Sequence, residues 1–371
     1  MKRLYFILSS GGIGNQMLQY SLFLKLKSLN YNCKFYKKPD HMNDNHGFDI
    51  DCIFKSILID KKSRYILNYY ISFYEFVNKI ECYISKRFNI EYLILSKYLP
   101  IQIINFPHWN DYTFLKNLLT PIHEIFDFPK LISVENIKIL NLISTTNSIS
   151  IHIRRGDYVT NYRWRSILGD ICDLDYYYSA INLIKKSIKS PVFFIFSDDV
   201  DWVKENLILD NCYFINWNLN NQSYLDMKLM ASCKHNIIAN STFSLMAAWL
   251  NTNPNKQIFG PKKWKNCFKD NSALKLMDPH WKIIYNDRPN ISIICEIKLK
   301  KNDLLNILNQ SYSDFEILLH LKYKNLIFDE RIKDLSISST SGVYIIVIDQ
   351  NMLSNFSSRN YLGDLLIKNY P

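Results

Sequence analysis

Between residues 148 and 261, short apolar segments alternate with amphipathic ones, and this alternation constrains the fold more than any other feature of the sequence. Segments such as 191–197 (PVFFIFS) are apolar and aromatic, which favours buried strands, whereas 224–233 has helical spacing. Strands that alternate with helices form parallel sheets, because each helix carries the chain back to the start of the next strand. We therefore expect an α/β domain of Rossmann type over residues 146–290.

Two other regions show the same rhythm. A strand at 3–9, a glycine-rich turn and a helix predict an N-terminal α/β domain over residues 1–145, and a further βαβ pattern predicts a short C-terminal appendage over 291–371. Residues 60–110 differ, because Tyr and Phe recur there at helical spacing among Lys and Arg. We expect a helical insertion packed on the core, although a basic aromatic helix can also lie on an anionic membrane.

The composition limits the class of protein. Apolar residues make up 48 % of the chain, which is enough for a large core, and Lys and Arg outnumber Asp and Glu by 45 to 34. The excess of +11 favours an anionic partner, such as a phosphorylated small molecule, a nucleic acid or an acidic membrane. The eight cysteines form no CxxC pair, so we expect free thiols in a reducing compartment.

Long apolar runs are missing from the sequence. The first one, Leu4–Leu8, is shorter than the ~7 residues that a signal peptide needs, and none approaches the ~18 residues of a membrane span. We therefore expect a cytoplasmic protein, with peripheral contact to the inner face of the cytoplasmic membrane as an option.

The most informative motif is the segment from His152 to Asp157, which ends an apolar strand. Open α/β sheets bind their ligands at such strand ends. The guanidinium groups of Arg154 and Arg155 can grip a diphosphate and stabilise charge on a departing nucleotide. Asp157 can pair with one arginine, and if the strand persists, the two arginines point to opposite sides. We interpret His152, Arg154, Arg155 and Asp157 as the candidate catalytic residues.

The turn from Gly11 to Gln16 is a second candidate. It has Met17 where a dinucleotide-binding motif has its third glycine, and no Gly-Lys-Ser/Thr follows as in a P-loop. Its backbone N–H groups can still face a phosphate or a sugar, so Gly14, Asn15 and Gln16 are candidate substrate-binding residues. The alternative is a plain turn in which Asn15 caps the helix.

Acidic residues follow the strand at 191–197. Asp199 and Asp201 have the DxD spacing typical of metal sites, but they begin a predicted helix, where capping and the helix dipole favour acidic residues. We therefore expect no metal. Asp198 lies nearest the strand end and could accept hydrogen bonds from the base or ribose of a nucleotide.

Amide and hydroxyl side chains end the strand that starts at His235. Asn240, Ser241 and Thr242 precede a predicted helix whose first N–H groups are free, which is typical of an anion site. The same side chains can act as helix caps without conflict. A serine nucleophile is not expected, because the sequence has no G-x-S-x-G motif.

These segments, in this order, resemble the bacterial α-1,2-fucosyltransferases of glycosyltransferase family 11. The similar segments are GGIGNQMLQY, SIHIRRGDYV, FFIFSDDVDWVKENL, LDMKLMASCKHNIIANSTFSLMAAWLN and NPNKQIFGPKKW. The similarity covers about residues 3–285 and is poor over 60–110. Leu245–Ala247 departs from the family, which usually has Trp-Trp-Gly at this point.

The resemblance implies a GT-B-like fold of two facing Rossmann-type domains. It implies transfer of L-fucose from GDP-fucose to the 2-hydroxyl of a β-galactoside in a surface glycan such as an O-antigen, with inversion and with no metal or other cofactor. By position, Arg154 and Arg155 correspond to the arginines of the nucleotide diphosphate, with His152 beside them. The general base stays open, because His152 could instead contact the donor and Asp157 could be bound to an arginine.

The C-terminal appendage resembles the opening of a family 2 glycosyltransferase of GT-A fold. It departs where an acidic run and a DxD motif are usual, because these places read Leu319–Lys322 and Asp349-Gln350-Asn351. We expect the appendage to be a partial, inactive domain.

Two other functions stay open beside the fucosyltransferase. One is a metal-dependent GT-A transferase that uses Asp199 and Asp201. The other is a non-enzymatic binder of nucleotides or RNA, suggested by the +11 charge, although no RNP motif is present.

Overall fold

The computed structural model describes the whole of the chain between residues 120 and 266 and several segments on either side. The described residues are 4–37, 50–60, 69–74, 76–77, 101–104, 115, 117–118, 120–266, 277–284, 291–295, 307, 315–319, 332–334 and 344–347. They form two compact units. The first unit contains residues 1–143, 217–232 and 242–254, and the second contains 144–216, 233–241 and 255–371.

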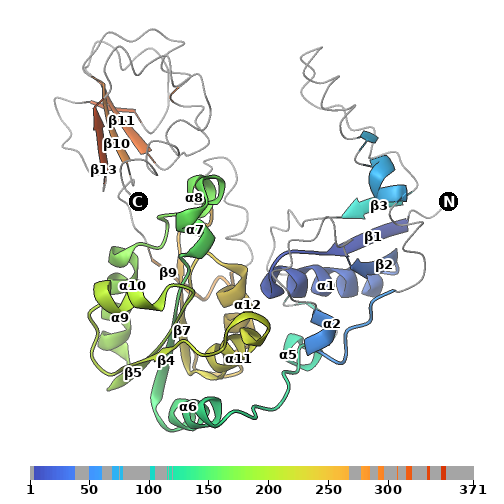
Figure 1. Cartoon of the computed structure of the whole chain (residues 1–371), viewed down its shortest axis with the longest axis horizontal. Coiled ribbons are helices and arrows are strands. Elements are labelled where there is room, and N and C mark those ends of the chain that lie inside the picture. The colour runs from blue at the N-terminus through green and yellow to red at the C-terminus, as the bar shows by residue number, and fades with distance from the viewer. Residues whose placement is uncertain are drawn as a thin grey trace. The chain divides into compact units, whose positions relative to one another are not determined.

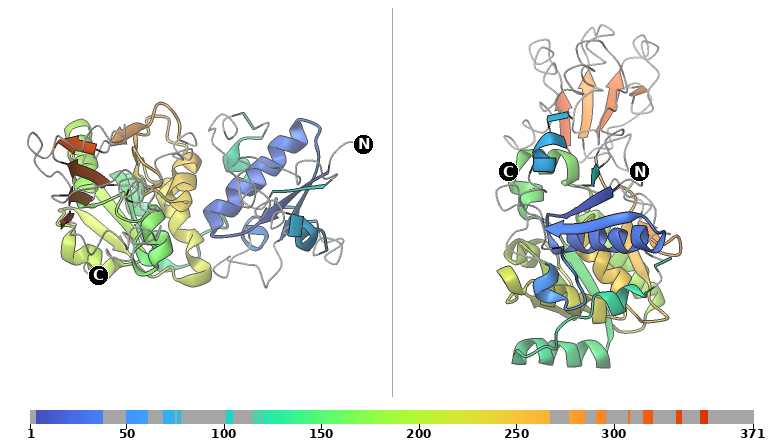
Figure 2. Two further views of the ribbon diagram at one scale, coloured as in Figure 1. Left: turned by 90° about the horizontal axis from the view of Figure 1, so that it is seen from above. Right: turned by 90° about the vertical axis from the view of Figure 1, so that its right-hand side faces the viewer.

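The first unit has a three-stranded parallel sheet in the order β2-β1-β3. Figures 1 and 2 show α1 lying along this sheet. The helix also packs against α12, which follows it by more than two hundred residues in the sequence. The elements of this unit are β1 (Leu4–Ser9), α1 (Ile13–Ser28), β2 (Asn32–Lys37), α2 (Ile50–Ile53), β3 (Ile101–Ile104), α5 (Ile122–Ile125), most of α6 (Val134–Thr145), the 3-10 turn η3 (Asn220–Gln222), α11 (Tyr224–Ser232) and α12 (Thr242–Leu250).

A buried polar network joins α6 to α11 in this unit. The side-chain amides of Asn136 and Asn218 exchange two hydrogen bonds of 2.8 and 2.9 Å, and Trp217 Nε1 donates to Asn136 Oδ1 at 2.9 Å. Asn218 Nδ2 also donates to Asp226 Oδ1 at 2.7 Å. Burial raises the pKa of Asp226 to about 7, although the hydrogen bond from Asn218 acts in the opposite direction.

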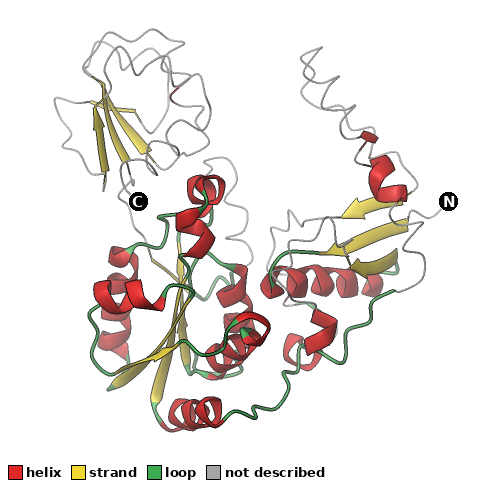
Figure 3. Cartoon of the chain, viewed as in Figure 1, coloured by secondary structure: helices red, strands yellow, loops and turns green. Residues whose placement is uncertain are grey.

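The second unit has a six-stranded parallel sheet in the order β6-β5-β4-β7-β8-β9. Counted along the chain, this is the 3-2-1-4-5-6 order of the Rossmann fold, in which the strand order reverses between β4 and β7. Figure 3 shows α9 and α10 on one side of the sheet. The elements are β4 (Asn147–Ile153), α7 (Gly156–Thr160), α8 (Tyr162–Leu168), α9 (Leu174–Ser187), β5 (Pro191–Ser197), α10 (Val200–Asn206), β6 (Cys212–Ile215), β7 (His235–Ile237), β8 (Ile258–Pro261) and β9 (Lys282–Ile284).

The core of the second unit explains why these segments are strands and helices. Ile149, Ile151 and Ile153 alternate along β4 and are at most 2 % exposed, and they pack with the apolar face of α9. The side chain of Asp173 caps α9 by accepting a hydrogen bond from the backbone N–H of Tyr176 at 2.8 Å. The α/β fold with parallel sheets that the sequence predicts is therefore confirmed.

The C-terminal appendage contains a four-stranded parallel sheet in the order β12-β11-β10-β13. The strands are β10 (Ile291–Cys295), β11 (Phe315–Leu319), β12 (Ile332–Asp334) and β13 (Tyr344–Val347). The helix expected between the first two lies outside the described residues, apart from residue 307, and so does Asp349.

Other expectations are tested only in part. The expected insertion at 60–110 falls mostly outside the described residues, within which 69–74 are helical and Ile101–Ile104 form β3. The thiols of Cys33, Cys172 and Cys212 are free, as expected. In the described part of the chain, no helix is long and apolar enough to cross a membrane. The expected domain boundaries at 145/146 and 290/291, and the facing arrangement of two domains, stay predictions.

Candidate active site

The register of β4 and β5 brings the two most informative motifs together. Ile153 and Ser197 are paired at the carboxyl ends of these neighbouring strands. The residues that follow them, from Arg154 and from Asp198, must therefore emerge side by side at the same edge of the sheet. This edge adjoins the point between β4 and β7 where the strand order reverses, which is where open α/β sheets bind ligands.

Arg154 bridges two carboxylates. Its Nη1 lies 2.7 Å from Asp198 Oδ2 and its Nη2 lies 2.6 Å from Asp157 Oδ1. Burial opposes the charge on Arg154, but Asp198 and Asp157 outweigh it and raise the pKa of the guanidinium. The predicted pairing of Asp157 with an arginine is thus confirmed, and Arg154 is a fixed, permanent cation at the strand end.

Arg155 is held by different partners. Its backbone N–H donates to Asp198 Oδ1 at 2.8 Å, and its Nε donates to Asp199 Oδ2 at 2.9 Å. The guanidinium carbon lies 3.5 Å from the centre of the Trp202 ring. Because β4 ends at Ile153, strand alternation does not separate the two arginines, and each is fixed by its own acidic partners.

Gly156 makes room for this cluster. A Cβ atom at Gly156 would lie 2.4 Å from Asp198 Oδ2, which is closer than any real contact. The glycine of the Arg-Arg-Gly-Asp motif therefore lets the Asp198 carboxylate sit directly against the backbone, where it reaches Arg154 and the N–H of Arg155.

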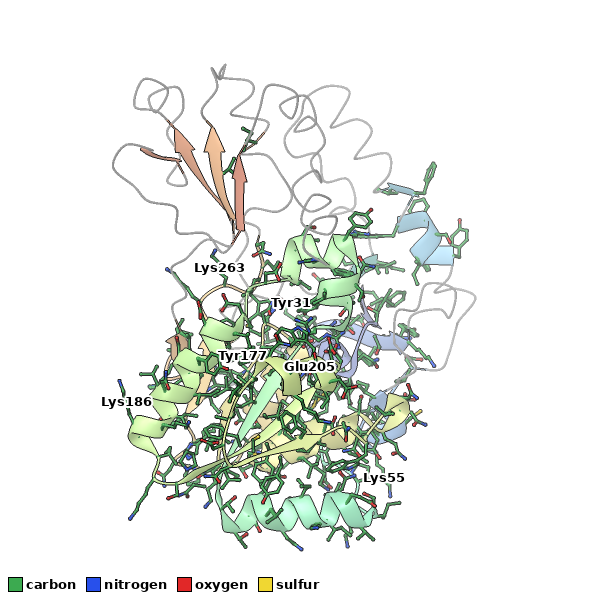
Figure 4. All side chains as sticks on the ribbon, turned by 60° about the vertical axis from the view of Figure 1, so that its left-hand side comes forward. Tyr31, Lys55, Tyr177, Lys186, Glu205 and Lys263 are labelled. Atoms are coloured by element: carbon green, nitrogen blue, oxygen red, sulfur yellow. The ribbon has the colours of Figure 1, made fainter. Side chains whose placement is uncertain are left out.

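His152 is buried directly below the cluster. It is 6 % exposed, and burial together with the nearby charge of Arg154 lowers its pKa to about 3. Tyr177 Oη donates a 2.9 Å hydrogen bond to the carbonyl oxygen of His152. Figure 4 shows Tyr177 among the packed side chains of α9, whereas Lys186 near the other end of this helix projects outward. A neutral, buried imidazole of this kind is a poor general base at neutral pH.

Asn240 follows β7, and its polar groups make hydrogen bonds within the protein. Its Nδ2 donates to the carbonyl oxygens of Leu168 and Trp264 at 2.9 and 3.2 Å, and its own carbonyl accepts from Tyr158 Oη at 3.2 Å. Ser241 is 8 % exposed, and Thr242 begins α12 in the first unit. These contacts favour a role for Asn240 in fixing the loops around the site.

The residues of the glycine-rich turn lie in the first unit. The helix α1 begins at Ile13 with Gly12 at the N-cap position, so the alternative in which Asn15 caps the helix is wrong. Gln16 is fully buried, and its amide accepts from Ser9 Oγ and donates to the carbonyl of Gly11. Asn15 is partly exposed, as are Gly11 and Gly12, whereas Gly14 is buried, so these three residues form the accessible part of the turn.

Gly14 explains how this turn is packed. A Cβ atom at this position would lie 2.4 Å from the carbonyl oxygen of Thr242. The glycine therefore lets α1 approach the first residue of α12 closely. Two of the predicted substrate-binding residues, Gly14 and Thr242, are thereby neighbours in the first unit.

The two acidic residues with metal-site spacing have separate roles. Asp199 Oδ1 accepts from the backbone N–H of Trp202 as the cap of α10, and Oδ2 accepts from Arg155. The side chain of Asp201 is 93 % exposed and lies 3.8 Å from Lys204 Nζ. The capping interpretation of Asp199 is confirmed, and no group of three or more His, Cys, Asp or Glu with metal-binding geometry occurs among the described residues.

Sequence reasoning missed the aromatic supports of the site. Trp202 covers Arg155, the Tyr158 ring lies 5.5 Å from the guanidinium carbon of Arg154, and Tyr177 holds the backbone of His152. A signal for two of them was available, because Tyr158 adjoins the motif and Trp202 stands one turn after Asp199. Their contacts depend on the fold and could not be read from spacing.

Comparison with known proteins decides the family. The model of glycosyl transferase family 11 matches residues 1–284. This chain belongs to glycosyltransferase family 11. The family implies a nucleotide-sugar donor and a glycan acceptor, and it decides against the alternative of a non-enzymatic RNA binder.

Curated relatives agree with this assignment. The chain is 31 % identical over 300 residues to the O-antigen biosynthesis glycosyltransferase WbnK of Escherichia coli, covering 73 % of this chain and 97 % of that protein. It is 32 % identical over 272 residues to an α-1,2-colitosyltransferase of Escherichia coli, covering 69 % and 90 %. It is 24 % identical to galactoside α-(1,2)-fucosyltransferase 2 of Mus musculus, covering 67 % and 69 %.

Among solved structures, the Escherichia coli ADP-heptose lipopolysaccharide heptosyltransferase II aligns with 76 % of this chain and 90 % of its own, at 11 % identity and a TM-score of 0.36.

Proposed function

We propose that this glycosyltransferase moves L-fucose from GDP-fucose to the 2-hydroxyl of a β-galactoside in a surface glycan, with inversion at the anomeric carbon. The observation that carries the proposal is the pair of fixed guanidinium groups, Arg154 and Arg155, at the carboxyl end of β4. The α-1,2 linkage in the names of two relatives supports the choice of bond.

The chemistry asks for charge stabilisation at the leaving group. In this reaction the bond between the anomeric carbon and the β-phosphate oxygen breaks, and the acceptor oxygen forms the new bond on the opposite face. GDP departs with the electron pair, so negative charge grows on the diphosphate. Arg154 and Arg155 are already held in place by carboxylates, and they can stabilise this charge without reorganising.

The acceptor hydroxyl must also lose a proton. His152 is poorly suited, because it is buried and its pKa is about 3. Asp157 is about one-third exposed and uses Oδ1 for Arg154, while its Oδ2 makes no hydrogen bond or ion pair within the described residues. Of the two candidates, we therefore favour Asp157 as general base and assign His152 a supporting role.

We also propose that transfer needs no metal. A divalent cation at Asp199 would compete with the hydrogen bond from Arg155 and with the cap of α10. The competing proposal, a metal-dependent reaction through Asp199 and Asp201, predicts that chelation with EDTA abolishes turnover and that Mn²⁺ restores it. We expect unchanged turnover in EDTA.

The test of the function is direct. The protein is incubated with GDP-fucose and a panel of β-galactosides, and the product mass, linkage and anomeric configuration are determined. We expect an α-1,2-linked fucoside. Failure of every galactoside with GDP-fucose, together with transfer from another sugar nucleotide, would overturn the proposal.

Colitosyl transfer is the second candidate, because an α-1,2-colitosyltransferase is 32 % identical over 90 % of its length. The corresponding colitose nucleotide is therefore tested as donor in parallel. Peripheral contact with an anionic membrane is a separate proposal, supported by the exposed rings of Tyr69, Phe73 and Phe76, and vesicle sedimentation tests it.

A further inference from the structure

We propose that Trp202 is a positioning residue that holds the guanidinium of Arg155 ready for the donor diphosphate. The inference rests on the proposed function, because it assigns a partner to one of the two arginines of that site. Trp202 contacts Arg155, and its ring acts on the donor only through that arginine.

The contacts of Arg155 leave only the terminal N–H groups of its guanidinium available to a ligand. Its backbone N–H is bonded to Asp198 and its Nε to Asp199, while one face of the guanidinium lies on the indole at 3.5 Å. The Nη1 and Nη2 groups make no hydrogen bond within the described residues. These are the two donors that match the oxygens of a phosphate in a bidentate contact.

Trp202 and Asp199 act from the same helical turn. Asp199 Oδ1 accepts from the backbone N–H of Trp202 at 3.4 Å, so the cap of α10 also sets the direction in which the indole leaves the helix. The ring is partly buried against the core cluster of the second unit, and the adjacent Val203 is fully buried. The indole is therefore fixed by the backbone of the first turn of α10 and by packing against the core.

Stacking suits this task better than a further charge. A guanidinium is weakly hydrated on its faces and stacks readily on aromatic rings, while its N–H groups point outward in its own plane. The indole thus limits the rotamers of Arg155 without using any of its donors. A third carboxylate would instead occupy the Nη groups and repel the phosphate.

A second Arg-Trp pair in the same unit provides the control. Arg163 lies 5.7 Å from the centre of the Trp164 ring, and the Trp164 residue is 41 % exposed on α8. Arg163 makes no ion pair with a carboxylate among the described residues, so this pair has the same residue types without the acidic partners that fix Arg155.

The experiment measures GDP affinity by calorimetry and steady-state kinetics in the full chain. We expect Trp202→Ala to weaken GDP binding about tenfold and to raise KM for the donor to a similar extent, with KM for the acceptor unchanged. Trp202→Phe keeps an aromatic face and should lose less than about threefold. Trp202→Leu keeps apolar volume without that face and should resemble Trp202→Ala. Trp164→Ala should bind GDP as the unchanged protein does.

A double-mutant cycle identifies the route of the effect. If Trp202 acts through Arg155, adding Trp202→Ala to Arg155→Ala should cost no further affinity. Multiplicative losses in the double variant, or equal affinities of the Leu and Phe variants, would overturn the inference. Should Trp202→Ala fail to fold, the Leu and Phe variants decide alone. If Arg155→Ala itself binds GDP normally, the proposed diphosphate role fails, which is a different result from failure of Trp202 alone.

Discussion

The turn after β1 and the turn after β4 occupy equivalent places, since each follows the first strand of a parallel sheet, yet they are held by different chemistry. Neutral amides close the first, where the Gln16 and Gln19 side chains bond the backbone and serine hydroxyls around Ser10. Arginine–carboxylate pairs close the second. Of the two turns, only the second places charged side chains where a ligand can reach them.

Each unit also buries a titratable group, which is an acid in the first unit and a base in the second. In the first, burial raises the pKa of Asp226 to about 7, and in the second, burial and Arg154 lower the pKa of His152 to about 3. In both cases burial shifts the pKa in the direction that favours the neutral form of the side chain. If the charged turn serves binding and the neutral turn serves packing, substitutions in the charged turn should change ligand affinity and substitutions in the neutral turn should change stability.

Removal of Arg154 should have the largest effect. Arg154→Ala leaves Asp157 and Asp198 as neighbouring uncompensated carboxylates at the proposed phosphate site, so we expect GDP affinity and kcat/KM to fall at least about a hundredfold. Arg163→Ala, which removes an exposed cation nearby in sequence, is the control and should change both by less than about threefold. Wild-type turnover of Arg154→Ala would show that the charged turn is structural as well.

Gly14→Ala tests the packing role of the neutral turn. The new Cβ would collide with the Thr242 backbone at 2.4 Å, so α1 and α12 must separate, at a cost of roughly 1–3 kcal/mol in the free energy of unfolding. Gly12→Ala is matched to it, because a Cβ there meets nothing within 4 Å and φ is −63°. Denaturant unfolding measures both, and equal stability of the two variants would contradict the packing role.

Asp226→Asn tests the buried carboxyl. Its folded pKa of about 7 lies above the unfolded value of 3.8, so its contribution to stability is complete below pH 3.8 and is lost as the pH rises through 7. The Asn variant keeps an acceptor for Asn218 and removes this titration. We expect its stability relative to the unchanged protein to increase by about 2–3 kcal/mol between pH 5 and pH 8. A constant difference across this range would show that the carboxyl does not titrate as stated.

Removal of residues 291–371 should have the smallest effect on transfer. The family model ends at residue 284, and the last strand of the six-stranded sheet is Lys282–Ile284. We expect chain 1–290 to keep its turnover per folded molecule, with Asp349→Ala in the full chain as a milder companion variant. A folded but inactive 1–290 would show that the appendage contributes to the site.

The fold was largely predictable because its signal is local. Apolar runs such as 191–197 and the caps and glycines between them lie within a few residues of one another, and β5 coincides with its predicted range. The motifs that form the site were predictable, because the carboxyl ends of parallel strands lie at the same edge of the sheet. The spacing of residues could not predict which side chains contact each other. Arg155 pairs with Asp199, which is forty-four residues away, and the buried Gln16 accepts a hydrogen bond from Ser9.

The division of the chain between the two units has a consequence during synthesis. The first unit contains residues 1–143, but it also needs 217–232 and 242–254, which supply α11 and α12. A ribosome adding about 5–20 residues per second needs about 10–40 s to go from the end of α1 to the start of α12. During that time α12 does not cover the surface of α1 around Gly14. A chaperone that binds exposed apolar surface would therefore bind nascent chains of this length.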